Sequence, residues 1–141
     1  MKRNGSKADT CPIARSLEAV GDAWSVLIVR DAFRGKRRFG EFEKSLGIAK
    51  NILTARLRKL VAAGVLEQAP AADGSAYHDY VLTDKGRGLV PVLVALGQWG
   101  CGTRDFRFVE TASGKRVRLD LRTEDGRTVG LSDVHLATPT G

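Results

Sequence analysis

The chain has 141 residues, a length typical of one domain, and 43% of them are hydrophobic, which is enough to bury a core. Its net charge of +7 favours an anionic partner, either nucleic acid or a membrane surface. No apolar run approaches the roughly 18 residues that a membrane-spanning helix needs, and the basic N-terminus leads into no apolar secretory segment. We therefore expect a cytoplasmic protein without a membrane partner.

The sequence contains few residues in patterns typical of catalysis or metal binding. Cys11 and Cys101 are the only cysteines, and with two histidines they predict neither a disulfide framework nor a zinc site. The sequence offers no nucleophile paired with a histidine, no glycine-rich phosphate loop and no cluster of carboxylates at helical spacing. We therefore expect no enzyme activity, no catalytic residues, no metal and no cofactor.

The first half of the chain is predicted to be helical. Pro12 is well placed to open a first helix and Gly21 to close it. Asp22 can cap a second helix that is apolar almost all round, which is typical of a central buried helix. Leu53 and Leu57 belong to an apolar stripe with helical spacing further along. The four helices are expected at about 12–20, 22–33, 39–47 and 50–64.

A β-hairpin and a last helix are predicted next. Apolar runs at 65–68 and 77–83 flank a turn segment that contains proline and Asp-Gly, which indicates two antiparallel strands. A last helix follows at about 84–100, capped by Thr83 or by the residue after it. Pro91 lies inside this span, so the helix either kinks there or begins near it.

This order of elements is typical of a winged helix-turn-helix, an α+β fold that is mostly helical with a β-hairpin wing, in which the helix before the hairpin enters the DNA major groove. Alternation of apolar and polar residues at 106–108 and 117–121, between Ser-Gly and Asp-Gly turns, predicts a small C-terminal antiparallel β extension from about 105 to 131. The expected organisation is a flexible polar tail at 1–10, a winged domain for DNA binding and dimerisation at 11–102, and a β-meander with its tail at 103–141.

Basic residues are concentrated around the predicted helix-turn-helix. Residues 30–59 contain ten lysines and arginines and three acids, an excess equal to the net charge of the whole chain. Lys50, Asn51 and Thr54 lie at the start of the recognition helix, where base contacts usually form, and Arg58 shares their face one turn further on. We expect these four side chains to contact double-stranded DNA.

Three further arginines are candidates for the same interface. Arg37 and Arg38 precede the third helix, a position suited to clamping a phosphate group. Arg56 has two open roles: it contacts DNA, or it pins the recognition helix to a neighbouring carboxylate.

Four motifs lie in order between residues 11 and 100. They are Cys-Pro-Ile at the start of the first helix, the single tryptophan of the second, Arg-Arg-Phe-Gly at 37–40 and Leu-Thr-x-x-Gly at 82–86. Together they resemble the HxlR-type transcriptional regulators. The resemblance implies a homodimeric repressor or activator that binds near-palindromic operator DNA, and several relatives respond to oxidants or electrophiles through the cysteine at the position of Cys11.

Two features depart from that family pattern. The wing segment 69–80 carries no lysine or arginine, which argues against a minor-groove contact by the wing. In some relatives the C-terminal extension resembles a cysteine-bearing zinc ribbon, whereas the turns of this extension have no cysteine. We therefore expect a metal-free extension.

Cys11 and Arg15 form a candidate redox sensor. The unpaired N–H groups and the dipole at a helix start favour a thiolate, and Arg15, four residues on, lies on the same face and can pair with it. The alternative is that Cys11 is a small buried residue that packs at a helix start.

The first and last helices are the predicted dimer interface, because the last helix carries more apolar area than a winged domain needs for its own core. The alternative is that they only cover the core of the monomer. Modification of Cys11 by an electrophile or oxidant, or a small molecule lodged between the first and last helices, would act as the effector by changing the separation of the recognition helices. The predicted interface residues are Ile13, Leu17, Leu89, Leu93, Leu96 and Trp99.

A winged-helix protein-interaction module without specific DNA binding is the alternative function, since the fold alone does not guarantee DNA binding. Such a module more often exposes apolar groups on its recognition helix. The basic excess of residues 30–59 favours DNA.

Overall fold

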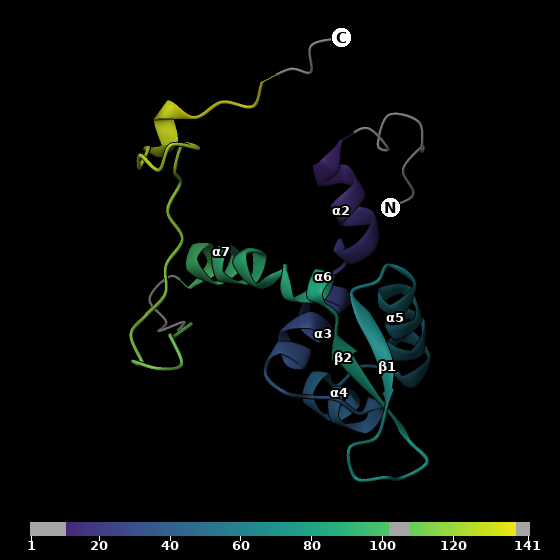
Figure 1. The fold of residues 1–141 in the computed structure, drawn as a ribbon. Helices are drawn as coiled ribbons and strands as arrows, with labels where there is room; N and C mark the ends of the chain where they lie inside the picture. Colours follow the sequence, from purple (N-terminus) through teal and green to yellow (C-terminus); the bar gives the residue numbers. More distant parts are fainter. Residues whose placement is uncertain (1–10, 102–107, 138–141) are drawn as a thin grey trace. The chain divides into compact units, whose positions relative to one another are not determined.

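The computed structural model describes residues 11–101 and 108–137 (Figure 1). The chain forms two compact units: the first ends at Val90 and the second begins at Pro91. None of the described helices is long and apolar enough to cross a membrane. The helices and strands are α2 (Pro12–Val20), α3 (Ala23–Phe33), α4 (Phe39–Leu46), α5 (Lys50–Ala62), β1 (Leu66–Pro70), β2 (His78–Leu82), α6 (Asp84–Arg87), α7 (Val90–Gly100) and the 3-10 turn η1 (Leu131–Asp133).

The core of the first unit is built around α3, which contacts α2, α4, α5 and β2. Ile28 of α3, Phe42 of α4 and Leu53 and Leu60 of α5 are fully buried, and Leu57 is 1% exposed. Burial of one such side chain stabilises a fold by roughly 1.5–3 kcal/mol, so these contacts hold the three helices as one body. The expectation of a central buried helix at 22–33 is confirmed.

Local chemistry sets where these helices begin and end. The Asp22 carboxylate caps α3 by accepting a hydrogen bond of 2.8 Å from the Ser25 backbone N–H. Gly47, in the left-handed conformation with φ 63°, ends α4 and allows the abrupt turn into α5. Ile48 within that turn is buried, which anchors the turn to the core. The pair α4 and α5 is therefore a helix-turn-helix.

The predicted hairpin is confirmed. Strands β1 and β2 are antiparallel, and their register pairs Leu66 with Leu82 and Pro70 with His78 (Figure 1). The connecting loop turns at Gly74, which has a φ of 75°. Within it the Asp73 carboxylate accepts a hydrogen bond of 3.0 Å from the Ser75 backbone N–H, a local turn that aspartate often stabilises.

The predicted last helix is two helices. Thr83 caps the short α6, with its hydroxyl oxygen accepting a hydrogen bond of 3.0 Å from the Gly86 backbone N–H. The helix is interrupted at Gly88 and Leu89, and α7 begins at Val90 with Pro91 in its first turn. Proline has no N–H to donate and its ring clashes with a preceding helical turn, whereas the first turn of a helix tolerates it. Of the two alternatives for Pro91, the structure shows the start of a helix.

The C-terminal extension is antiparallel but less regular than predicted. Its described part contains two isolated bridges, Val109 with Arg116 and Arg122 with Thr128, and no regular strand at 117–121. The Gln98 side-chain amide of α7 instead pairs with the Leu119 backbone, accepting from its N–H at 2.9 Å and donating to its carbonyl at 3.2 Å. The predicted strand at 106–108 lies mostly outside the described residues.

Candidate nucleic-acid interface

The second helix of the helix-turn-helix, α5, exposes polar and basic side chains. Lys50, Asn51 and Arg58 are exposed, whereas Leu53 and Leu57 on the other side of the helix pack into the core. An exposed face of this kind offers ammonium, amide and guanidinium donors at once, the groups that contact phosphates and base edges. The structure therefore brings three of the predicted DNA-contacting residues onto one accessible face.

Thr54 lies on the same helix but is half-buried. Its hydroxyl donates a hydrogen bond of 2.8 Å to the Lys50 carbonyl, one turn back along the helix. Its oxygen lone pairs stay available, so Thr54 can still accept a hydrogen bond from a partner.

Arg56 connects α5 to the start of α3. Its Nε lies 3.0 Å from Asp22 Oδ1, and Lys59 Nζ lies 3.4 Å from Asp22 Oδ2. The Asp22 carboxylate therefore caps α3 and holds α5 at the same time. Of the two roles left open for Arg56, the structure shows the ion pair with a neighbouring carboxylate.

The hydrogen bonds and charges around Asp22 keep its carboxyl group ionised. Partial burial alone would raise its pKa, but hydrogen bonds from the Ser25 side chain and backbone and from Lys59, together with the Arg56 charge, lower the pKa from 3.8 to about 2. Asp22 is consequently an anion throughout the physiological pH range.

Replacing Asp22 by alanine should lower the free energy of unfolding at neutral pH by about 1–2 kcal/mol, because α3 loses its cap and the two cations lose their partner. This contribution is present above the unfolded-state pKa of 3.8 and is lost as pH falls through about 2. Urea unfolding of both proteins at neutral and acidic pH measures it. Asp22→Asn is the control, since it keeps a capping oxygen without the charge, and an equally large acid dependence in that variant would contradict the assignment.

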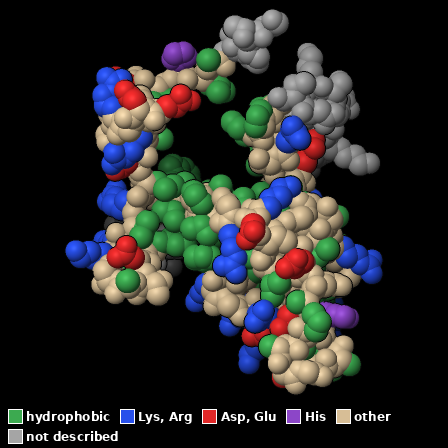
Figure 2. Space-filling view, in the orientation of Figure 1, with side chains coloured by type: hydrophobic (Ala, Val, Ile, Leu, Met, Phe, Trp, Pro, Cys, Tyr) green, Lys and Arg blue, Asp and Glu red, His purple; other side chains and the backbone are tan. Residues whose placement is uncertain are grey.

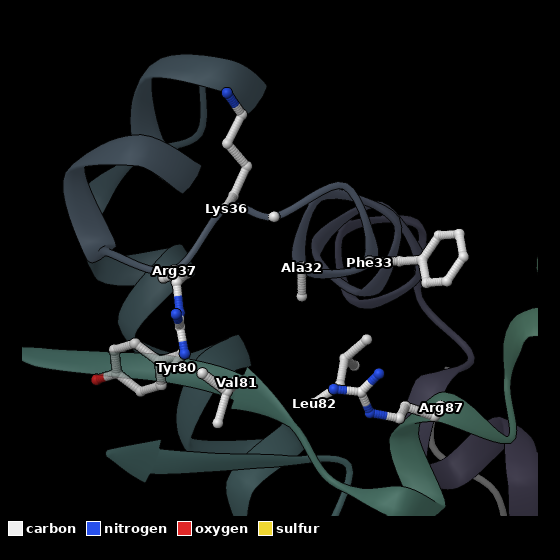
Figure 3. Close-up of a pocket in the computed structure, with 9 residues that line it drawn as sticks. Ala32, Phe33, Lys36, Arg37, Tyr80, Val81, Leu82 and Arg87 are labelled. Carbon is white, nitrogen blue, oxygen red and sulfur yellow. The ribbon is translucent and has the colours of Figure 1, made fainter. Parts of the chain in front are cut away.

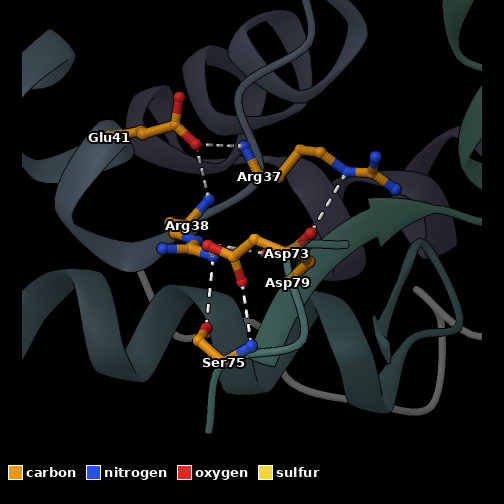
Figure 4. A network of polar contacts seen from close by, with 6 residues as sticks. All are labelled: Arg37, Arg38, Glu41, Asp73, Ser75 and Asp79. Carbon is orange, nitrogen blue, oxygen red and sulfur yellow. Dashed lines mark hydrogen bonds and ion pairs between the residues drawn. The ribbon is translucent and has the colours of Figure 1, made fainter. Parts of the chain in front are cut away.

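Arg37 and Arg38 meet the carboxylates of the wing (Figure 4). Asp79 of β2 lies between them, with its Oδ2 3.5 Å from Arg37 Nε and its Oδ1 3.6 Å from Arg38 Nε. Asp79 is only 3% exposed, so its charge is largely removed from water and depends on both guanidinium groups. The loop before the helix-turn-helix is thus held to the wing by charge.

A second contact connects Arg38 to the tip of the wing. Arg38 Nη2 forms an ion pair with Asp73 and donates to Ser75 Oγ at 3.3 Å, and its guanidinium carbon lies 5.7 Å from the centre of the Tyr77 ring (Figure 4). Hydrogen bonds from Ser75 and from Arg38 lower the pKa of Asp73 to about 2. The acidic wing tip therefore stays charged and holds Arg38 at neutral pH.

Backbone contacts reinforce this arrangement. The Tyr80 N–H of β2 donates to the Arg37 carbonyl at 2.7 Å. The loop before α4 is therefore hydrogen-bonded to the edge of β2 that does not pair with β1. The Glu41 carboxylate accepts from the backbone N–H groups of Arg37 at 3.2 Å and Arg38 at 3.1 Å, which caps α4. Both arginine side chains are consequently presented from a fixed backbone.

The wing carboxylates belong to the candidate site and were not identified from the sequence. The absence of lysine and arginine from the wing indicates only that the wing makes no minor-groove contact. The signal that identifies them is the acidic pair Asp73 and Asp79 in the same segment. Their partners could not be recognised, because Arg38 and Asp73 lie 35 residues apart along the chain.

The candidate sensor residues lie at the start of α2. Cys11 is the residue before the first helical position and is exposed, and its carbonyl accepts from the Arg15 N–H at 2.9 Å. The Arg15 side chain is also exposed. Within a single chain, Cys11 is therefore not a buried packing residue.

The predicted dimer residues differ in exposure. On α2, Ile13 is 60% and Leu17 50% exposed. In the second unit, hydrophobic side chains gather over α7 (Figure 2), where Leu96 is 48% and Trp99 89% exposed. Leu93 is buried and Leu89 is half-buried, so these two contribute little to an outer face.

A helix-turn-helix with an exposed basic second helix, followed by a two-stranded hairpin, defines this protein as a winged helix-turn-helix protein. A family model described as HxlR-like helix-turn-helix matches residues 19–106, and the chain belongs to this family. The curated relatives that it matches are HTH-type transcriptional regulators.

Relatives and solved structures agree with this assignment. The HTH-type transcriptional regulator Rv3095 of Mycobacterium tuberculosis is 44% identical over 88 residues, which cover 62% of this chain and 56% of Rv3095, so the match spans little more than half of that relative. The crystal structure of PA1607 is similar over 96% of this chain and all of its own, with 50% identity and a TM-score of 0.84. The redox regulator HypR in its reduced form matches 67% of this chain and 95% of its own, with 30% identity and a TM-score of 0.60.

Proposed function

We propose that this protein binds duplex DNA sequence-specifically, as a homodimer on a near-palindromic operator, and acts there as a repressor or an activator. The observation that carries the proposal is the exposed face of α5 with Lys50, Asn51 and Arg58, in a helix-turn-helix of a regulator family. In a dimer, the two α5 helices would enter successive major grooves, about 34 Å apart.

The arginines around α5 have separate roles in this proposal. Arg37 and Arg38 bind phosphate groups: their side chains are 49% and 36% exposed, and a guanidinium has five N–H donors, more than the wing carboxylates occupy. Arg56 supports binding by holding α5 to Asp22, which sets the angle at which the helix is presented. Thr54, whose hydroxyl proton is donated to the Lys50 carbonyl, accepts a hydrogen bond at the edge of the contact.

The homodimer is supported by the exposed apolar side chains of α2 and α7, which a second copy would remove from water. Light scattering on the purified protein should give a mass of about twice 15.2 kDa. A monomer at micromolar concentration would refute the dimer while leaving the DNA proposal open to its own test.

The test of DNA binding is fluorescence anisotropy with the DNA directly upstream of the protein's own gene, against a scrambled duplex of equal length, across a salt series. Tighter binding to the upstream DNA that survives near-physiological salt supports a sequence-specific regulator. Equal and salt-sensitive binding to both duplexes contradicts it for that operator and favours the interaction module.

We further propose that the regulator responds to electrophiles or oxidants through Cys11. The thiol is exposed at the start of α2, and the redox regulator HypR is similar over two thirds of this chain. With a maleimide, the sulfur forms a bond to one carbon of the double bond, and the neighbouring carbon takes up the proton that the thiol gives up. The added group, directly before α2, would disturb the dimer and thereby the spacing of the α5 helices.

Replacing Cys11 by serine should abolish the response of DNA binding to N-ethylmaleimide while leaving the affinity of the untreated protein within about twofold, because serine keeps the size of the side chain without the nucleophilic sulfur. Anisotropy before and after treatment measures this. Cys101→Ser is the matched control and should still respond. A Cys11→Ser protein that loses DNA affinity on treatment like the wild type would contradict the sensor role.

A further inference from the structure

An open pocket of about 360 Å³ lies between the end of α3, the loop before α4, and β2 (Figure 3). Ala32 and the side chains of Val81 and Leu82 provide its apolar wall, and the Tyr80 ring lies at one side. Its volume is within the range of about 300–1,000 Å³ that is usual for small-molecule sites. All of its lining residues belong to the first unit.

The charged residues that line the pocket are all positive. Lys36, Arg37 and Arg87 line it, and none of the described residues that line it is a carboxylate. Figure 3 shows the Arg87 guanidinium extending from α6 toward Leu82, and the Arg37 guanidinium extending beside Tyr80 and Val81, while the Lys36 ammonium points away. Two guanidinium groups therefore flank one apolar wall.

The two arginine side chains differ in the ion pairs and hydrogen bonds that they already make within the protein. Arg37 has Asp79 at 3.5 Å. The Arg87 side chain has no ion pair or hydrogen bond to any residue in the part of the chain that the structure describes. A guanidinium beside an apolar wall is suited to a planar carboxylate, which it can bind through two parallel N–H···O bonds.

We propose that this pocket binds a small organic anion, an aromatic or alicyclic carboxylate. The ring lies against Val81, Leu82 and Tyr80, and the carboxylate accepts hydrogen bonds from Arg87 and Arg37. The apolar wall excludes inorganic anions as preferred ligands, because they would leave it in contact with water.

The pocket is connected to the proposed DNA interface through Arg37. Its carbonyl accepts from the Tyr80 N–H, and its side chain shares Asp79 with Arg38. A carboxylate bound to Arg37 neutralises one phosphate-binding cation and competes with Asp79. The ligand therefore lowers affinity for the operator, a consequence that rests on the proposed function, whereas binding of the ligand does not.

The test is a titration of the ¹⁵N-labelled full chain with sodium benzoate, followed by backbone amide shifts. Saturable shifts are expected at Ala32, Val81 and Leu82, with benzyl alcohol, which has the same ring without the charge, producing much smaller ones. Arg87→Gln should raise the Kd for benzoate about tenfold by removing a charge-assisted contact. Arg34→Gln is the matched control, an exposed arginine at the end of α3 that does not line the pocket, and should leave the Kd unchanged.

Several outcomes would overturn the proposal. Absent or non-saturable shifts, or equal shifts with benzyl alcohol, refute an anion site, and inorganic phosphate binding as tightly as benzoate refutes the organic class. If Arg87→Gln weakens binding of ligand-free protein to DNA tenfold, Arg87 is a DNA contact and the small-anion site is wrong. The spread of the backbone amide chemical shifts in the ¹⁵N spectrum of each variant checks that the variant is folded. Benzoate binding without any operator binding would refute the proposed function alone.

Discussion

Replacing Lys50 and Arg58 together by alanine should weaken binding to the operator by about 100-fold or more. Each side chain lies on the exposed face of α5, and a contact of this type to a base or phosphate contributes about 1–3 kcal/mol. Loss of phosphate contacts also reduces the salt dependence, by about 0.9 in the slope of log K against log salt for each phosphate. Fluorescence anisotropy across a salt series measures both effects.

The control for this double substitution removes the same charge elsewhere. Lys115 and Arg118 are exposed in the C-terminal extension, and replacing both by alanine also lowers the net charge by two. We expect that variant to bind the operator within about threefold of the wild type. If both double variants lose affinity equally, binding depends on overall charge rather than on the face of α5, and the sequence-specific proposal is wrong.

Replacing Gly86 by alanine should lower the free energy of unfolding by about 3 kcal/mol and the Tm by about 10 °C. A Cβ at this position would lie 2.1 Å from the Val65 carbonyl oxygen and 3.0 Å from Leu82 Cδ2. The carbonyl cannot move away freely, because it accepts hydrogen bonds of 3.1 Å from the Thr83 N–H and 3.2 Å from the Thr83 hydroxyl. The substitution therefore pushes α6 away from Val65, the residue that precedes β1.

Gly40 provides the matched control for that prediction. It lies within α4, and a Cβ there would meet nothing within 4 Å. Gly40→Ala should leave stability unchanged or raise it by about 0.5–1 kcal/mol, because alanine has the higher helix propensity. Thermal and urea unfolding followed by circular dichroism compare the two variants. Equal stability of Gly86→Ala and the wild type would show that the backbone at Val65 relaxes at no cost.

The Leu-Thr-x-x-Gly motif acquires a physical explanation from these contacts. Thr83 caps α6 and its hydroxyl also donates to the carbonyls of Gly64 and Val65, while Gly86 provides the close approach that these bonds require. Threonine and glycine at this spacing therefore join the end of α5 and β1 to the start of α6. The motif supports the resemblance to the family, and the structure shows that its threonine and glycine hold α6 against the segment between α5 and β1.

Several features of this protein follow from the sequence alone. The caps at Asp22 and Thr83, the closing glycine Gly21 and the leucine stripe of α5 are local signals that predicted the helices, and the Asp-Gly turn between two apolar runs predicted the hairpin. The polar side chains of α5 could be assigned to the exposed face for the same reason, since helical periodicity separates them from the leucines. The extension was predicted less well, because Val117 and Leu121 alternate like strand residues but have no regular partner strand in the described part of the chain.

The pairing of charges was decided only by the tertiary structure. Asp22 with Arg56, Arg38 with Asp73, and Asp79 with both Arg37 and Arg38 join segments that the packed core brings together. Residues more than 30 apart along the chain have no local pattern that predicts their contact. The pocket beside β2 has the same origin, since α3, the loop and α6 each contribute part of it. Periodicity and capping act over a few residues and can be recognised in the sequence, whereas an ion pair or a pocket depends on the three-dimensional packing of distant segments.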